Sequence, residues 1–303
     1  MSIATAAAGV RPVPIAEAPL RKPKKKWSRL ILPTYTILLM LYLATPILMM
    51  ILYGFNDIPG ERQTPRFWGF TLDWYRTMFD DPSLTQAVRN SVVIAIMAAA
   101  IATPLGTTLG LALGRYGFRG KAAVSFVIFM AIAIPEIVLG SSLLSMFVQA
   151  RAPLGFMTIL LSHVAFNTPF VAVTVRARVQ GMDRSLEDAA QDLFATPPVA
   201  FYKVTLPIIL PGIIAGLMLA FVLSLDDFVI TNFVSGQLQT FPIWVYGATR
   251  IGLPPTVNVL GTLLFVAGIV LALLSALSQR GEKPSRGRAP AKAGVPAAGS
   301  ARE

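Results

Sequence analysis

Cysteine is absent from the sequence, and histidine occurs once, as His163. Without thiols the chain forms no disulfide bond, offers no cysteine nucleophile and ligates no iron–sulfur cluster. A single imidazole also excludes a metal site built from several histidines. The sequence therefore predicts no catalytic residue and no metal ligand in this chain.

Charged residues are also scarce, at 14% of 303 residues, whereas 54% are hydrophobic. A soluble domain of this length carries more charge, so the composition indicates a protein that crosses a membrane several times. The formal net charge of +11 raises the question of a nucleic acid partner. Because the basic residues lie in the terminal segments and short loops and form no groove-reading motif, we expect the lipid bilayer as a partner and no nucleic acid.

Six stretches are long and apolar enough to cross a bilayer as helices, each of which needs about 20 residues. Glu136 interrupts the third stretch, and Pro254-Pro255 precedes the sixth. The expected fold is all-α, a polytopic membrane protein with six transmembrane helices. The predicted spans cover residues 30–55, 90–114, 122–149, 154–175, 208–233 and 256–279.

Lysine and arginine predict the orientation, because positively charged loops stay on the cytoplasmic side. They gather in both terminal segments and after the second and fourth spans, which places both termini in the cytoplasm. The first apolar run is too long for a cleaved signal and is expected to be a retained anchor. The predicted organisation is a disordered basic tail at 1–29, a first transmembrane helix at 30–55, an extracytoplasmic loop at 56–85, a core with five transmembrane helices at 86–279 and a disordered tail at 280–303.

The cytoplasmic segment between the fourth and fifth spans, residues 180–207, has the pattern of two short helices joined by a turn. Ser185 is a candidate cap for the first helix, and Glu187 and Asp188 follow in its first turn, where the helix dipole favours acidic side chains. Pro197 is suited to the first position of the second helix. Such a pattern is more ordered than a passive connector requires.

The string Glu187-Asp-Ala-Ala-Gln-Asp-Leu-Phe-Ala, followed by Leu206-Pro207, resembles the EAA loop of the permeases of binding-protein-dependent ABC importers. In that family the loop forms a coupling helix that sits in a cleft of a cytoplasmic ATPase. Its acidic residue lies at the interface, and its alanines allow close approach. The resemblance implies ATPase-coupling roles for Glu187, Asp188, Ala189, Ala190, Phe194 and Pro207.

One position departs from this family, which usually has glycine where this chain has Phe194. We therefore expect the tight turn between the two short helices to be made differently, by Pro197-Pro198. The alternative to a coupling role is an amphipathic hairpin that only packs beneath the helix bundle.

The sequence contains no G-x-x-x-x-G-K-[ST] phosphate-binding loop, which an ATPase of this kind needs. The nearest string ends at Lys121, but it has Arg115 at the first glycine position and Ala122 at the Ser/Thr position. We therefore expect that this chain is a transporter subunit and not an enzyme, that it binds no cofactor, and that a separate ATPase uses ATP and Mg.

Three acidic residues, Glu136, Asp226 and Asp227, lie within predicted spans that contain no lysine or arginine. Charged groups inside a membrane are costly and mark candidate pathway residues. Carboxylates without compensating positive charge suit a cation better than an anion. Alternatives are open: Glu136 as a helix-start acid that holds backbone donors, Asp226 and Asp227 as residues that pair with a sister subunit or hold a bend. We expect His163 to be a hydrogen-bonded packing residue.

Three segments are similar to the second permease subunit of spermidine/putrescine importers: 134–140, 224–236 with its Ser-Leu-Asp-Asp string, and 241–258. The likeness extends over about residues 86–279. It implies the type I ABC importer permease fold, with the coupling loop between spans four and five, in a bacterial inner membrane. It also implies a polyamine or another small organic cation as the solute. The implied partners are ABC ATPase subunits, a second permease subunit and an extracytoplasmic solute-binding protein.

Related permeases for opines, other amines, thiamine or metals share much of this pattern, so these solutes stay open. A gradient-driven secondary transporter, with Glu136 and Asp227 as ion sites, is the main alternative of another class. A membrane scaffold without transport is a third reading, and it leaves the intramembrane acids without a purpose.

Overall fold

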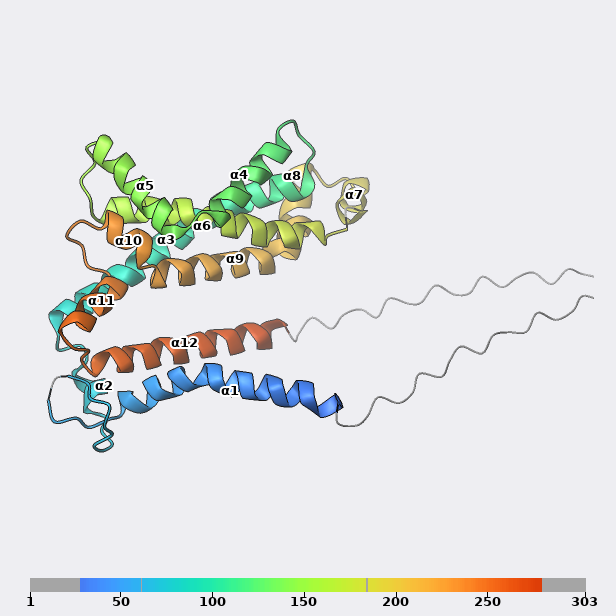
Figure 1. Cartoon of the computed structure of the whole chain (residues 1–303). Helices are drawn as coiled ribbons and strands as arrows, with labels where there is room; N and C mark the ends of the chain where they lie inside the picture. Colours follow the sequence, from blue (N-terminus) through green and yellow to red (C-terminus); the bar gives the residue numbers. More distant parts are fainter. Residues whose placement is uncertain (1–27, 61, 184, 280–303) are drawn as a thin grey trace, which may run out of the picture. The chain divides into compact units, whose positions relative to one another are not determined.

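The computed structural model describes residues 28–60, 62–183 and 185–279, and within these ranges every regular element is helical (Figure 1). An isolated antiparallel bridge joins Asn56 and Phe70. The all-α prediction is therefore confirmed for this part of the chain. Apart from residues 28 and 29, the predicted tails lie outside the described residues.

The chain divides into two compact units, residues 1–49 and 50–303. The first unit contains most of α1, Ser28–Gly54, whose 27 residues rise about 40 Å, enough to cross the hydrocarbon core. Its large apolar side chains are mostly exposed. Thr36 and Thr45 donate their hydroxyls to carbonyls one turn earlier, which satisfies them without water.

The second unit contains the remaining helices, among which η1 is a short π-helical segment. In chain order their bounds are α2 Asp73–Thr77, α3 Pro82–Arg115, α4 Lys121–Ala133, α5 Glu136–Gln149, α6 Phe156–Gln180, α7 Ser185–Asp192, α8 Pro197–Ala200, η1 Phe201–Thr205, α9 Leu206–Asp226, α10 Val229–Val234, α11 Phe241–Ile251 and α12 Thr256–Gln279.

Four helical stretches of the described chain are long and apolar enough to span a membrane. Two further helices, α4 and α5, together make a fifth candidate, although they are bent by 104° at the break between them. The apolar part of α12, Thr256–Val270, is shorter than the length that a full membrane span needs. The prediction of several transmembrane helices is confirmed at four or five, and the sixth stays a prediction. The four stretches are Ile31–Gly54, Pro82–Arg115, Phe156–Gln180 and Pro197–Asp226.

The start of α3 shows how the sequence fixes a helix end. Asp81 has an extended backbone, and its carboxylate accepts hydrogen bonds from the backbone N–H groups of Ser83, at 2.8 Å, and Leu84, at 3.4 Å. Pro82 stands at the first helical position, where no N–H donor is needed. The helix begins at this cap, eight residues before the predicted span at 90, because the cap and not the apolar run determines where it starts.

Close backbone contact holds α3 against α6. Three glycines of α3, four residues apart, face three valines of α6 at the same spacing, and a Cβ added at Gly106 would lie 2.5 Å from the Cβ of Val171. The α9 helix joins this pair through Gly216, which also faces Val171. Small residues at such positions let membrane helices approach closely. The core therefore consists of α3, α6 and α9, packed against one another.

A second packed region joins the short helices α5 and α10. Gly140 of α5 faces Ile230 and Phe233 of α10, and a Cβ there would lie 2.7 Å from the Phe233 ring. The α10 helix also packs on α6. Since α5 and α10 each begin just after an interrupted helix, this contact brings the two interruptions into one region of the molecule.

Candidate functional site

The first interruption separates α9 from α10. The α9 helix ends at Asp226, and Asp227 has an extended backbone, with φ −64° and ψ 118°. The carboxylate of Asp227 accepts hydrogen bonds from the backbone N–H of Thr231 at 2.8 Å and from its hydroxyl at 2.7 Å. Asp227, which precedes the N-cap residue Phe228, therefore supplies an acceptor to the first turn of α10, where the N-terminal helix donors need one.

The single histidine fastens this interruption to α6. His163 Nδ1 lies 2.6 Å from the hydroxyl of Ser224 on α9, and its Nε2 lies 2.8 Å from the hydroxyl of Thr231 on α10. The same Nε2 is 3.3 Å from the carboxylate of Asp227. All four residues are buried. The expectation that His163 is a hydrogen-bonded packing residue is confirmed.

The second interruption separates α4 from α5 at Ile134 and Pro135. Pro135 occupies the N-cap position, where it provides no side-chain acceptor, and Glu136 begins α5 with an exposed side chain. No hydrogen bond joins the Glu136 carboxylate to another described residue, so the expectation that it holds neighbouring backbone donors finds no support here.

The predicted pathway acids lie in one region but in different settings. Glu136 begins α5, Asp226 ends α9 and Asp227 follows it, and the contact between α5 and α10 brings these two interruptions together. Glu136 and Asp226 are exposed in the isolated subunit, whereas Asp227 is buried. Two of the carboxylates are therefore accessible in the isolated chain, and the third is occupied by His163 and Thr231.

The segment between α6 and α9 forms the expected pair of short helices, α7 and α8. Asp183 accepts a hydrogen bond from the backbone N–H of Ser185 at 3.0 Å. Ser185 is the first residue of α7 and not its cap, so that assignment was wrong. Hydrogen bonds from Ser185 hold the pKa of the Asp183 carboxyl below its usual range. The acceptor at this helix start is thus Asp183.

The turn after α7 is made by Phe194 itself, which has a left-handed backbone with φ 66°. The backbone N–H of Ala195 donates to the backbone carbonyl of Ala190 at 3.0 Å. The backbone N–H of Phe194 donates to the backbone carbonyl of Gln191 at 2.9 Å. This pair of bonds is the Schellman motif, in which glycine usually takes the left-handed position. The expectation that Pro197-Pro198 makes the turn was therefore wrong.

The side chains of this hairpin point in two directions. Asp188 and Ala189 are exposed, as is the tip, where Leu193 is 81% and Phe194 96% exposed. Glu187 is the one buried residue of α7. Its carboxylate pairs with Arg115 at the end of α3 and accepts a hydrogen bond from Thr205. Neighbouring acids thus face different surroundings.

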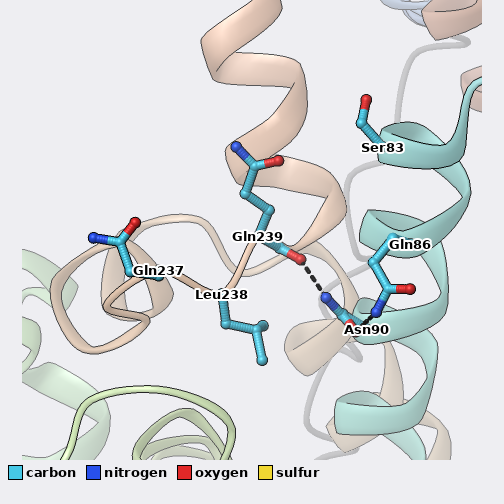
Figure 2. Close-up of a pocket in the computed structure, with 6 residues that line it drawn as sticks. All are labelled: Ser83, Gln86, Asn90, Gln237, Leu238 and Gln239. Carbon is cyan, nitrogen blue, oxygen red and sulfur yellow. Dashed lines mark hydrogen bonds between the residues drawn. The ribbon is translucent and has the colours of Figure 1, made fainter.

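A polar pocket that the sequence did not point to lies at the N-terminal end of α3 (Figure 2). Its volume is about 380 Å³, and Asn90 stands in its wall, donating to the carbonyl of Gln239 at 2.7 Å and accepting from Gln86 at 3.1 Å. A neighbouring pocket of about 780 Å³ contains Trp74 and Trp244. The residues that line the smaller pocket are Ser83, Gln86, Asn90, Gln237, Leu238 and Gln239.

Residues 106–281 match the family described as the binding-protein-dependent transport system inner membrane component. The spermidine/putrescine transport system permease protein PotC of Haemophilus influenzae is 38% identical over 240 residues, which cover 79% of this chain and 92% of the relative. The putrescine transport system permease protein PotI of Escherichia coli is 40% identical over 251 residues, covering 80% and 88%.

Solved structures share the fold. A bacterial ABC transporter involved in the import of the acidic polysaccharide alginate superposes with a TM-score of 0.59 over 86% of this chain and all of that one, at 15% identity. An amino acid ABC transporter gives 0.54 over 70% of this chain and all of that one, at 18% identity. At these identities the likeness concerns the fold alone.

Proposed function

The chain belongs to the family of binding-protein-dependent transport system inner membrane components, which are permease subunits of ABC importers, and we propose that its solute is a polyamine of the putrescine or spermidine type or another small organic cation. The relatives described above are named for spermidine/putrescine and putrescine transport. The observation that carries the proposal is the pair of exposed acids, Glu136 and Asp226, at two adjacent helix interruptions.

The chemistry of these interruptions favours a protonated amine. An ammonium group that leaves water needs a compensating charge or hydrogen-bond acceptors, and a carboxylate supplies both. No lysine or arginine occurs between residues 122 and 149 or between 208 and 233, so an anion would meet uncompensated negative charge. We assign Glu136 and Asp226 to the solute pathway.

Asp227 has a different role in this proposal. Its carboxylate already accepts two hydrogen bonds from Thr231 and lies beside His163. A solute would have to displace these partners to reach it. We therefore assign Asp227 to holding the α9–α10 interruption, and so to positioning Asp226, which precedes it in the chain.

The cytoplasmic hairpin is the proposed contact with the motor. Asp188 and Ala189 are exposed on α7, Ala190 is half-buried beside them, and the apolar tip of Leu193 and Phe194 is exposed. Such a surface, acidic and apolar, fits a cleft on a separate ATPase that uses ATP and Mg. Pro207, in the first turn of α9, stands where the hairpin joins the bundle.

The proposed assembly places the chain as a multi-pass subunit of a bacterial inner membrane with six spans and both termini cytoplasmic. The loop at 56–85 lies outside, α12 provides the sixth span, and residues 86–279 form the permease core. A second permease subunit completes the pore, and a solute-binding protein delivers the solute from outside. Closure of the ATPase subunits then rocks the helices between inward-facing and outward-facing states.

The test uses the purified cognate solute-binding protein and the assembled transporter. We expect the binding protein to prefer putrescine or spermidine over opines, thiamine and metal ions. We also expect Asp226→Asn and Glu136→Gln each to lower uptake about tenfold or more, since each removes a charge worth more than 1 kcal/mol in a site of low dielectric. A binding protein selective for an anion, with both variants fully active, would rule out the polyamine assignment and leave the importer intact.

A further inference from the structure

We propose that Glu187 forms, with Arg115 and Thr205, a link that transmits movement of the cytoplasmic hairpin to α3 and α9. Glu187 is thus a positioning residue for coupling and not a contact of the ATPase. The inference rests on the proposed function, because it assumes that the hairpin meets a motor. It separates two adjacent acids by role: Asp188 for docking, Glu187 for transmission.

The first step is the placement of Glu187 on α7. Successive residues of an α-helix point about 100° apart, so neighbouring side chains meet different surroundings. Asp188 and Leu186 are exposed, while the Glu187 side chain is 11% exposed. A carboxylate is costly to bury unless it is paired and hydrogen-bonded. Its burial is therefore explained by its partners.

The second step is the origin of those partners. One carboxylate oxygen of Glu187 pairs with the guanidinium of Arg115, the last residue of α3, and the other accepts a hydrogen bond from the hydroxyl of Thr205. Thr205 is fully buried and ends the π-helical segment η1, directly before α9. One side chain of the hairpin thus joins the ends of two long helices that are distant in sequence.

The third step is the stiffness of the ends that Glu187 joins. Near Arg115, a Cβ at Gly114 would lie 2.7 Å from Val179 of α6. At the start of α9, Gly212 makes a similarly close contact with Arg178, whose Nε donates to the carbonyl of Ile208 at 3.0 Å. The cytoplasmic ends of α3, α6 and α9 are thereby packed together, and a displacement applied through Glu187 acts on them as one body.

The π-helical segment fits this role. Segments of this kind are rare and often occur at functional sites, because the extra residue in the turn re-aims the side chains that follow. Here the segment lies between the hairpin and α9. The hydroxyl of its last residue, Thr205, donates a hydrogen bond to the carboxylate of Glu187. The hairpin therefore reaches α9 both along the backbone and through this side-chain bond.

The test compares variants of the complete transporter, with its ATPase and partner permease, in proteoliposomes. For Glu187→Gln we expect normal copurification of the ATPase and continued ATP hydrolysis, but about tenfold less solute carried per ATP, the scale of a coupling residue. Thr205→Val, which keeps the shape of the side chain, is expected to act in the same direction more weakly. Asp80→Asn, at an exposed acid outside the hairpin, is the matched control and should change none of these quantities.

The exchange Glu187→Arg with Arg115→Glu keeps the pair with its charges reversed, and we expect it to recover part of the solute carried per ATP. Unchanged transport per ATP in Glu187→Gln, or no recovery by the exchange in an assembled complex, would overturn the link. So would loss of the ATPase from Glu187→Gln, because that would place Glu187 in the docking surface. Asp188→Lys is expected to lose the ATPase; if it does not, the docking proposal fails while the result for Glu187 still stands.

Discussion

Phe194 combines two unfavourable features, a left-handed backbone and an exposed aromatic side chain. A left-handed backbone costs a non-glycine residue about 1–2 kcal/mol, and this side chain is also 96% exposed. Backbone strain of this kind persists where a surrounding structure or a function maintains it. The two hydrogen bonds of the turn account for the backbone, and the proposed docking surface accounts for the ring.

We predict that Phe194→Gly keeps the turn and weakens the binding of the ATPase. Glycine adopts the left-handed conformation freely, so the hairpin loses its strain, while the buried contact of an aromatic ring, about 2 kcal/mol, is lost from the interface. The expected effect is a fall in affinity of more than tenfold, measured by titrating the detergent-solubilised permease pair with ATPase. Phe194→Leu, which stays apolar, is the control, and equal affinities for all three proteins would contradict the docking role.

The adjacent residues Asp226 and Asp227 give a second prediction, because one is exposed and the other is buried. Asp227→Ala removes the acceptor for the first turn of α10, a loss of about 1 kcal/mol, and leaves buried donors on Thr231. We expect a lower midpoint of thermal unfolding for the purified complex, measured by intrinsic fluorescence. Asp226→Asn, at the neighbouring exposed position, should leave this midpoint unchanged while lowering uptake. The reverse pattern would assign the two aspartates the opposite way.

Among the helices, packing of α3 on α6 depends on glycines that face valines. We predict that Gly106→Ala lowers the thermal unfolding midpoint, because the added methyl group meets Val171 at 2.5 Å and overpacking costs about 1–3 kcal/mol. Gly268→Ala in α12, where the space beside the backbone is open in this chain, is the matched control. Equal midpoints for the two variants would show that α3 and α6 do not pack this closely.

How much of these elements the sequence predicts depends on whether the signal is local. Apolar runs locate α1, α6 and α9, whereas the predicted span at 90 misses the start of α3, which the local pair Asp81-Pro82 marks in the structure. The interruption at Pro135 is visible as a proline before an acid, yet its 104° bend depends on packing between elements. The length of a span is predicted less well: the apolar part of α12, Thr256–Val270, is shorter than the predicted span at 256–279.

The candidate sites divide in the same way. The acids Glu136, Asp226 and Asp227 stand out in the sequence because charge is rare in apolar runs. That Asp227 is buried against His163, 64 residues earlier, follows from tertiary packing and has no local signal. Likewise Glu187 and Asp188 look equivalent in sequence, and the positions of Arg115 and Thr205 decide which one faces inward.

For the whole molecule, the central proposition is that this permease moves a cation only when a separate ATPase binds its hairpin. Its family and fold place it among subunits of ABC importers, and the exposed hairpin is the proposed docking surface for the motor. A gradient-driven transporter would have no need of that surface. The two possibilities differ in what happens when the motor is removed.

The deciding measurement is uptake of labelled putrescine into proteoliposomes that contain this permease, its partner permease and the ATPase, with the solute-binding protein and putrescine outside and ATP trapped inside. We predict uptake that requires both ATP and the binding protein and that ceases when the ATPase is omitted, whatever ion gradient is imposed. Uptake that continues without the ATPase, driven by a proton or sodium gradient, would contradict it.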